Sequence, residues 1–304
     1  VAYGSSPFYN MTWRDHGEDE ANAATRVACE HIEKARGLAR HATEIENRLV
    51  EALACRVQKP HAVRPEDYDC WDDDYAAALR RLYHQYRDDH DVVALFVEAL
   101  IMRTPRRLWD VKTGRPGANS DVLEALEVCE RAIAGTDQNR RNIHPALLHL
   151  HIHILEMSNE PERARTSAAV LATLCPDAGH MNHMPGHVHV LCGEYQQAKI
   201  ASERAIAAND TYLAYAGLLT PYTTACAHDL LLMMHTCMFM GRYEDSIGAA
   251  NKLRGMLTKD VLSVMIPRSF LFRRRCITMR KAWPMLRSSS STMPTVNARC
   301  FTRA

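Results

Sequence analysis

The hydrophobic positions along this 304-residue chain recur with the period of an α-helix, and the alternation typical of β-strands is nearly absent. The pattern predicts one long amphipathic helix over residues 18–57 and shorter helices over residues 71–87, 90–103 and 121–134. Segments that carry proline and glycine, such as residues 104–120, separate them. We therefore predict an all-α protein.

Part of the chain repeats itself at an offset of 34 residues, which is the period of tetratricopeptide helix pairs. The offset pairs Ala164 with Ala198, where a small side chain lets two helices approach closely. A Gly-x-Tyr turn at Gly193 returns at Gly241, 48 residues later, and we assign the extra 14 residues to an insertion around residues 209–223. The repeats are predicted to be helical hairpins.

The period and the turn resemble those of the tetratricopeptide repeat family, with the best match over residues 145–257. The resemblance implies a solenoid of helical hairpins wound as a right-handed superhelix, in which the first helix of each pair lines a concave groove. We expect residues 1–265 to form this repeat domain, with an upstream repeat missing. Residues 266–304 do not continue the repeat and are expected to be a basic, atypical tail that is poorly ordered or aberrant.

Histidines recur at matching positions of the first helix in each repeat. When the turn residue is counted as position 15, these side chains fall at positions 2, 5, 9 and 12, which cover an arc of about 80° on a helix. They therefore share one face, which the family resemblance places in the groove. The residues concerned are His149, His153, His180, His183, His187, His228, His235 and Glu156.

Two of the pairs, His149/His153 and His183/His187, have the His-x-x-x-His spacing that points two imidazoles the same way. Nitrogen ligands with a nearby carboxylate suit zinc, iron, copper or manganese. We predict that the eight residues bind a divalent transition metal whose identity the pattern leaves open. Glu156 is also the candidate catalytic residue, as a ligand or general base.

Three further residues qualify this pattern. His151 and His189 lie two residues out of phase, so we assign them to packing or to contacts behind the ligands. Pro185 is expected in the first turn of its helix, where proline is tolerated. His180 and His183 would then lie on the entry turn of that helix.

The segments around the histidines resemble a histidine-rich branch of tetratricopeptide proteins found in bacteria and fungi. Residues 144–156 read HPALLHLHIHILE and residues 179–187 read GHMNHMPGH, while residues 2–4 and 98–102 are similar to the branch's opening and middle segments. Leu231 stands where that branch favours histidine. The resemblance covers about residues 1–260 and implies a fold and a site without a reaction.

The charge distribution bears on the possible partners. The formal net charge is +1, but residues 261–304 hold nine of the 37 Lys and Arg and no Asp or Glu, which leaves the body with a net charge of about −8. Such a body is not expected to bind nucleic acid.

No apolar run approaches the roughly 20 residues of a membrane span. The ten cysteines include no CxxC pair, which favours reduced thiols in a cytoplasmic protein.

Two acidic features of the first half are weaker candidates for a functional role. Asp72, Asp73 and Asp74 are expected to form the negatively charged start of a helix after Trp71. Glu98 is either a buried acid near the groove or a surface residue.

Three functions remain open. The first is a metal-dependent enzyme that acts on a small organic substrate in the groove. The second is an interaction scaffold that binds an extended peptide there, and the third is a metal store or sensor. Peptide-binding grooves offer Asn, Lys and Arg at positions 2, 5, 9 and 12, where this chain has mostly histidine. This difference favours the enzyme.

Overall fold

The computed structural model describes residues 18–61, 65–136, 143–220 and 222–265, and within them almost all regular structure is helical. The prediction of an all-α protein is confirmed, whereas the tetratricopeptide superhelix remains a prediction. The expectations for residues 2–4 and for the tail at 266–304 lie outside the described residues. The chain divides into two units, residues 1–170 and 171–304, which are described separately below.

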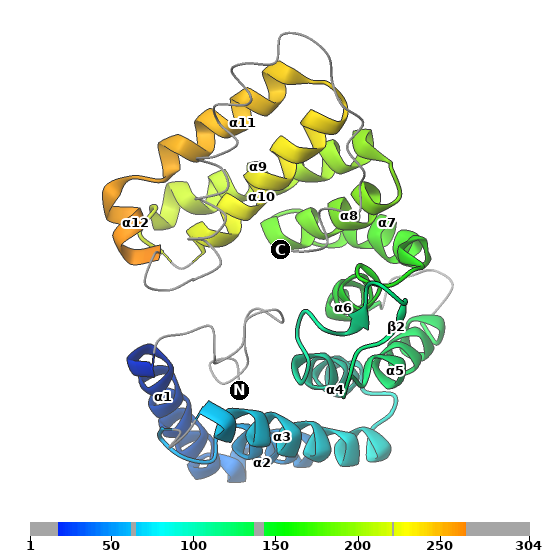
Figure 1. Cartoon of the computed structure of the whole chain (residues 1–304). Helices are drawn as coiled ribbons and strands as arrows, with labels where there is room; N and C mark the ends of the chain where they lie inside the picture. Colours follow the sequence, from blue (N-terminus) through cyan, green and yellow to red (C-terminus); the bar gives the residue numbers. More distant parts are fainter. Residues whose placement is uncertain (1–17, 62–64, 137–142, 221, 266–304) are drawn as a thin grey trace. The chain divides into compact units, whose positions relative to one another are not determined.

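The first unit starts with two helices where the sequence predicts one. Helix α1 (Glu18–Gly37) and helix α2 (Glu44–Arg56) are joined through the short 3₁₀ helix η2 (Ala39–His41) (Figure 1). The Thr43 hydroxyl accepts a hydrogen bond from the backbone N–H of Glu46, whose carboxylate accepts one from the N–H of Thr43. This capping box satisfies N–H groups at the helix start and begins α2 as a new helix.

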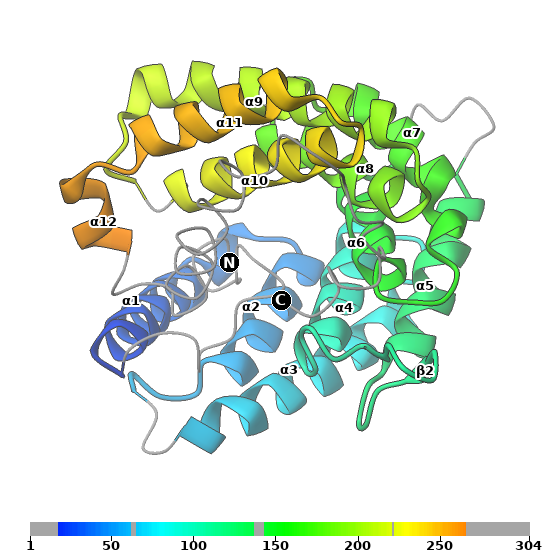
Figure 2. The ribbon, with the colours of Figure 1, turned by 45° about the horizontal axis from the view of Figure 1, so that its top comes forward.

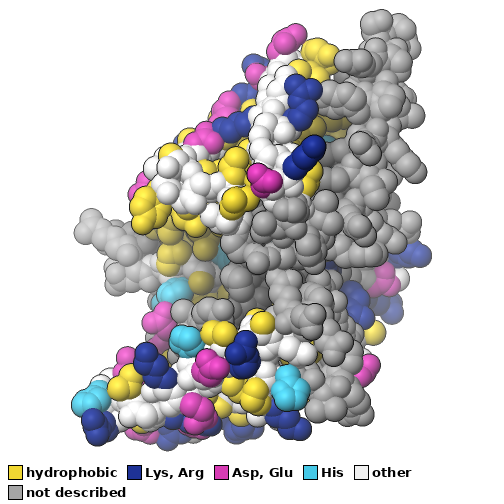
Figure 3. Space-filling model, turned by 90° about the vertical axis from the view of Figure 1, so that its left-hand side faces the viewer, with side chains coloured by type: hydrophobic (Ala, Val, Ile, Leu, Met, Phe, Trp, Pro, Cys, Tyr) yellow, Lys and Arg dark blue, Asp and Glu magenta, His cyan; other side chains and the backbone are white. Residues whose placement is uncertain are grey.

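Charged side chains of both signs cover the surface of α1 and α2. Arg36 bonds to Glu33 within α1 and to Glu51 on α2, and Arg48 pairs with Glu44 one turn before it on α2. Basic and acidic side chains accordingly lie side by side on the face shown in Figure 3. Exposed pairs of this kind contribute little to stability.

Helix α3 (Pro65–Gln85) begins six residues before its predicted start, with Pro65 at the position where proline suits a helix. The expectation that Asp72–Asp74 open this helix is therefore wrong. Their carboxylates lie inside α3, where Asp72 pairs with Arg56 of α2 and Asp73 pairs with Arg103. Asp74 accepts a hydrogen bond from the side-chain amide of Gln58. Contacts with other segments, and not the helix dipole, account for the three carboxylates.

The remaining elements of the first unit hold helix α6 in position. Its buried side chains include Leu147, Leu148 and Ile152, and it packs against α4 and α5. The indole N–H of Trp109 donates to the carbonyl of Ile154 at 2.6 Å and ties the strand pair β1–β2 to α6. The elements are α4 (His90–Met102), β1 (Trp109–Asp110), β2 (Arg115–Pro116), α5 (Val122–Ala134), α6 (Pro145–Leu155) and η3 (Pro161–Ala164).

Helix α7 (Arg165–Leu174) contains the boundary between the units, and the second unit continues as a series of hairpins. Helix α10 lies beside α9 and α11 in Figures 1 and 2, and α8 packs against both α9 and α10. The helices are α8 (Gly179–Leu191), α9 (Tyr195–Ala216), α10 (Thr223–Phe239), α11 (Tyr243–Met256) and α12 (Lys259–Met265). No helix in the described ranges combines the length and the apolar character needed to cross a bilayer.

The two turns predicted from the Gly-x-Tyr repeat are confirmed. Gly193 and Gly241 have φ angles of +76° and +68°, in the left-handed region that glycine adopts at little cost. The predicted insertion after residue 209 is in part helical, because α9 runs for 22 residues and ends only at Ala216. The two hairpins α8–α9 and α10–α11 thus bring the first helices α8 and α10 into contact.

Candidate metal centre

Helix α8, which carries four of the histidines, is continuous although it contains a proline. Pro185 lies inside α8 and not in its first turn, so that expectation is wrong. Proline removes one backbone hydrogen bond, but Pro185 and its neighbour Gly186 are both buried. A Cβ on Gly186 would lie 2.9 Å from Cδ2 of Leu232 on α10, so this part of α8 is held closely against α10. Tertiary packing keeps the helix intact across the proline.

Three imidazoles of the second unit converge. His183 and His187 lie one turn apart on α8, and their Nε2 atoms are 2.7 Å apart. The ring of His228 on α10 lies 4.7 Å from the ring of His183 and 5.8 Å from that of His187, measured between centroids. One nitrogen from each ring can be chosen so that all three lie within 4.8 Å of one another. This set, called the histidine triad below, could hold a metal ion.

The triad is shielded unevenly. The His183 side chain is fully buried, whereas His187 and His228 are partly exposed. A ligand set with this arrangement is anchored in the core at one side and can be reached by solvent at the other. Such access is what a metal needs if it is to bind water or a substrate.

A buried carboxylate lies behind His183. Oδ1 of Asp229, on α10, is 3.0 Å from Nδ1 of His183, and the Asp229 side chain is 1% exposed. Burial raises the pKa of Asp229 to about 7, while a hydrogen bond from Asn209 and the neighbouring His187 act in the opposite direction. A carboxylate next to the non-ligating nitrogen of a histidine is a common feature of metal sites, because it orients the ring.

Asp229 is absent from the residues predicted from sequence, although a signal was present. It is the acidic residue of α10, which otherwise carries no Asp, Glu, Lys or Arg. An acid in such a helix is costly to bury unless it has polar partners. Its partners come from other helices, and a repeat position does not reveal them.

Two of the other predicted ligands in this unit, His180 and His235, lie on the same two helices as the triad. The ring of His180 stacks on that of His183, with centroids 6.1 Å apart and planes 20° apart. His235 lies two turns after His228 on α10 and is not one of the three converging residues. His189 is out of phase with the predicted ligand positions, and its Nδ1 lies 2.7 Å from Oε2 of Glu194.

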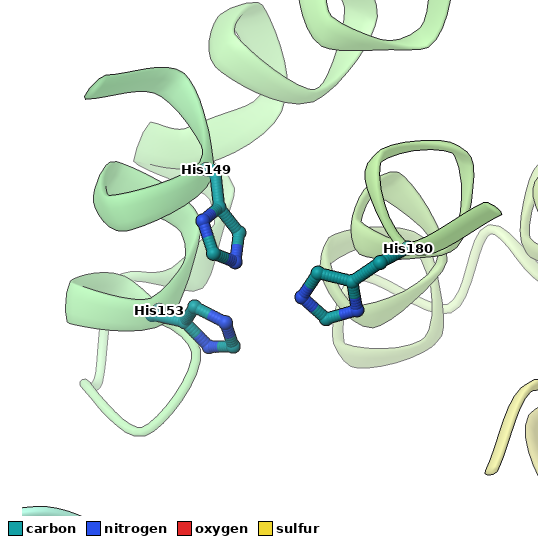
Figure 4. A group of neighbouring side chains, drawn as sticks. All are labelled: His149, His153 and His180. Carbon is teal, nitrogen blue, oxygen red and sulfur yellow. The ribbon is translucent and has the colours of Figure 1, made fainter. Parts of the chain in front are cut away.

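Helix α6 of the first unit carries a second histidine pair. His149 and His153 project from the same side of α6 in Figure 4, with ring centroids 4.6 Å apart. Nδ1 of His153 lies 2.9 Å from Oε1 of Glu156, the residue that ends the helix. Glu156 therefore stands behind a histidine, as Asp229 does. Whether histidines of all the repeats share one groove remains a prediction.

His151 of α6 faces away from this pair, as its phase indicates. It is buried, its Nδ1 lies 2.8 Å from the Ser167 hydroxyl, and its Nε2 lies 3.4 Å from Glu130. Burial lowers the pKa of His151, and Glu130 opposes that effect. Its contacts are those of a packed core residue.

Comparisons with protein-family models, curated proteins and solved structures find no match for this chain. What the fold and the site define is a class: an all-α protein with histidine groups that could hold a metal ion. The resemblance to histidine-rich tetratricopeptide proteins stays a prediction.

Proposed function

We propose that the second unit binds a divalent transition metal ion through His183, His187 and His228, and that the protein is a metal-dependent enzyme acting on a small organic substrate. The observation that carries the proposal is the convergence of three imidazole nitrogens within 4.8 Å, with a buried carboxylate behind one of them. Imidazole nitrogen is a good ligand for zinc, iron and copper, and also binds manganese.

Three protein ligands favour catalysis over a purely structural site. Structural zinc sites use four protein ligands, whereas catalytic sites use three and leave a position for water or substrate. A metal in such a site lowers the pKa of its bound water to near neutrality or polarises a carbonyl group. Because His187 and His228 are partly exposed, that position would be open to a small molecule.

A peptide-binding scaffold explains these residues less well. A fully buried His183 offers nothing to an extended peptide, and a buried acid beside it adds a desolvation cost with no role in peptide binding. A metal store or sensor would use the same ligands as an enzyme. The difference between them is whether the metal keeps an exchangeable position.

The test is a metal titration of the full chain purified without a histidine tag. Zinc, iron, copper and manganese are supplied in turn, and bound metal is measured by elemental analysis. The His187→Ala/His228→Ala variant is compared with His189→Ala/His235→Ala, which removes two histidines of the same helices outside the triad. We expect one equivalent of metal in the parent protein and control, and at least about tenfold weaker binding in the triad variant.

Substoichiometric metal in the parent protein under all four conditions would contradict the proposal. A third variant, His149→Ala/His153→Ala, tests the α6 pair and with it the prediction that Glu156 acts as a ligand or general base. If metal is bound, X-ray absorption spectra with and without an added small anion show whether a coordination position is exchangeable. A closed four-ligand shell would favour storage or a structural role.

A further inference from the structure

A row of polar side chains connects the start of α8 to His183. It consists of the buried side chains Asn209, Asp229 and His183 and the half-buried Tyr222, and is called the Asp229 network below. The Tyr222 hydroxyl donates to Oδ1 of Asn209 at 2.9 Å, and Nδ2 of Asn209 donates to Oδ2 of Asp229 at 2.6 Å. Asn209 is 3% exposed and Asp229 is 1% exposed, so little water competes for these bonds.

The network has a direction that follows from which groups can donate. The phenolic oxygen of Tyr222 accepts a hydrogen bond from the backbone N–H of His180, so its own proton is free to go to Asn209. With Oδ1 accepting, the Asn209 amide turns its NH₂ to Asp229. When Asp229 is ionised, both of its oxygens can only accept, so a donor is favoured next to each of them. On Oδ1 that neighbour is Nδ1 of His183, 3.0 Å away.

We propose, on the basis of the metal site proposed above, that the Asp229 network fixes His183 with its proton on Nδ1, so that the lone pair of Nε2 is directed to the metal. Tyr222 and Asn209 are then positioning residues for a ligand that neither of them touches. The network also links the backbone at the start of α8 to Asn209 of α9, to Asp229 of α10 and to Tyr222, which directly precedes α10.

The geometry of His183 fits a ring that completes its alignment when a cation binds. Nδ1 of His183 and Oδ1 of Asp229 are close but not aligned as a hydrogen bond. The Nε2 atoms of His183 and His187 are 2.7 Å apart. A tetrahedral zinc with bonds of about 2.0–2.1 Å would hold two nitrogens about 3.3 Å apart, so its binding would require the two rings to turn slightly. Rotation about the last side-chain torsion is inexpensive.

Gly179 supports this reading of the network. A Cβ at Gly179 would lie 1.9 Å from Oδ1 of Asn209 and 2.9 Å from the Tyr222 hydroxyl. Only glycine leaves room for both side chains at the first residue of α8. The glycine in the GHMNHMPGH segment thus has a structural reason, since it admits the network that reaches the histidine four residues later.

The experiment uses the full chain and zinc alone as the probe. Zinc affinity, from competition with a chelator, is measured for the parent protein, Asp229→Asn, Asn209→Ala and Tyr222→Phe. Removing partners behind a ligand typically costs 10–100-fold in metal affinity; we expect that range for Asp229→Asn and roughly tenfold for Asn209→Ala. The control is Ser202→Ala, which deletes a buried hydroxyl of α9 that donates to the carbonyl of Ala198 in the same helix.

A second readout separates positioning from stability. The ¹⁵N NMR spectrum of His183 is expected to show the Nδ1–H form in the parent protein and a loss of that preference in Asn209→Ala. Unchanged zinc affinity in Asp229→Asn and Asn209→Ala, or a drop no greater than in Ser202→Ala at equal loss of thermal stability, would overturn the proposal. If the parent protein binds no zinc, the proposed function fails. The tautomer of metal-free His183 then decides separately whether the network orients the ring.

Discussion

Asp229 and His183 are both fully buried, and their side chains meet at 3.0 Å on facing helices of the second unit. A buried acid is a cost to folding unless it is satisfied, and Asn209 supplies only one of its hydrogen bonds. Retaining the acid is understandable if it orients a ligand. At the scale of single residues, burying Asp229 lowers the stability of the second unit, and on our proposal it orients the His183 ring for metal binding.

The space at Gly179 gives a prediction about this arrangement. In Gly179→Ala, the new methyl group collides with Asn209 and Tyr222, so we expect a loss of about 1–3 kcal/mol in the free energy of unfolding and weaker zinc binding. The control is Gly248→Ala in α11, where a Cβ meets nothing within 4 Å, and a gain of about 0.5–1 kcal/mol is expected. Denaturant unfolding and zinc competition measure both. Equal behaviour of the two variants would show that the space at Gly179 is not required.

Glu98 gives a residue-scale prediction in the first unit. Burial raises the pKa of Glu98, while Arg56 opposes it, and burial raises the pKa of Asp72 beside the same arginine. Because the folded pKa of Glu98 lies above the unfolded value, the folded state holds the extra proton between the two values. The free energy of unfolding therefore falls as pH rises through that window.

We accordingly expect Glu98→Gln to be more stable than the parent protein at pH 8, by on the order of 1 kcal/mol, and to lose that advantage at pH 4. Urea unfolding at the two pH values measures the difference, with Glu127→Gln, an exposed carboxyl of α5, as the control. A parent protein that is the more stable at pH 8 would mean that attraction to Arg56 outweighs burial.

At the scale of elements, the contact of α8 with α10 determines whether histidines from two repeats can meet. Gly186 lies at this contact, where an added side chain would press on Leu232. We expect Gly186→Val to separate the helices, to cost about 1–3 kcal/mol and to weaken zinc binding. Adding Leu232→Ala to Gly186→Val should restore part of the lost stability and part of the lost zinc affinity. Gly255→Val, at a position of α11 with open space, is the control. Zinc binding unaffected by Gly186→Val would mean that the triad tolerates a wider spacing.

The elements also show how far the sequence could be interpreted. The helical period predicted α4 and α5, and the Gly-x-Tyr repeat predicted both glycine turns, because these features depend on local patterns. The break between α1 and α2 was missed although Thr43 and Glu46 form a local capping box. Pro185 was misplaced because the packing that tolerates it comes from other helices. Spacing singled out His183 and His187 for the same face, but not Asp229 or Asn209, whose role depends on three helices meeting.

At the scale of the whole molecule, we expect bound metal to stabilise one of the two units more than the other. A ligand that binds only the folded state stabilises it by about 2.7 kcal/mol at a concentration 100 times its dissociation constant. If the histidine triad is the site, this stabilisation falls on the unit that contains it. Hydrogen exchange of the full chain with saturating zinc should then slow in peptides from α8, α9 and α10 and change little in those from α2 to α4.

The change should disappear in His187→Ala/His228→Ala and persist in His189→Ala/His235→Ala. Slowing confined to α6 peptides would instead assign the metal to His149 and His153, and equal slowing in the triad variant would contradict a site on α8 and α10. Because exchange reports each helix separately, it locates the metal without assuming how the two units are arranged.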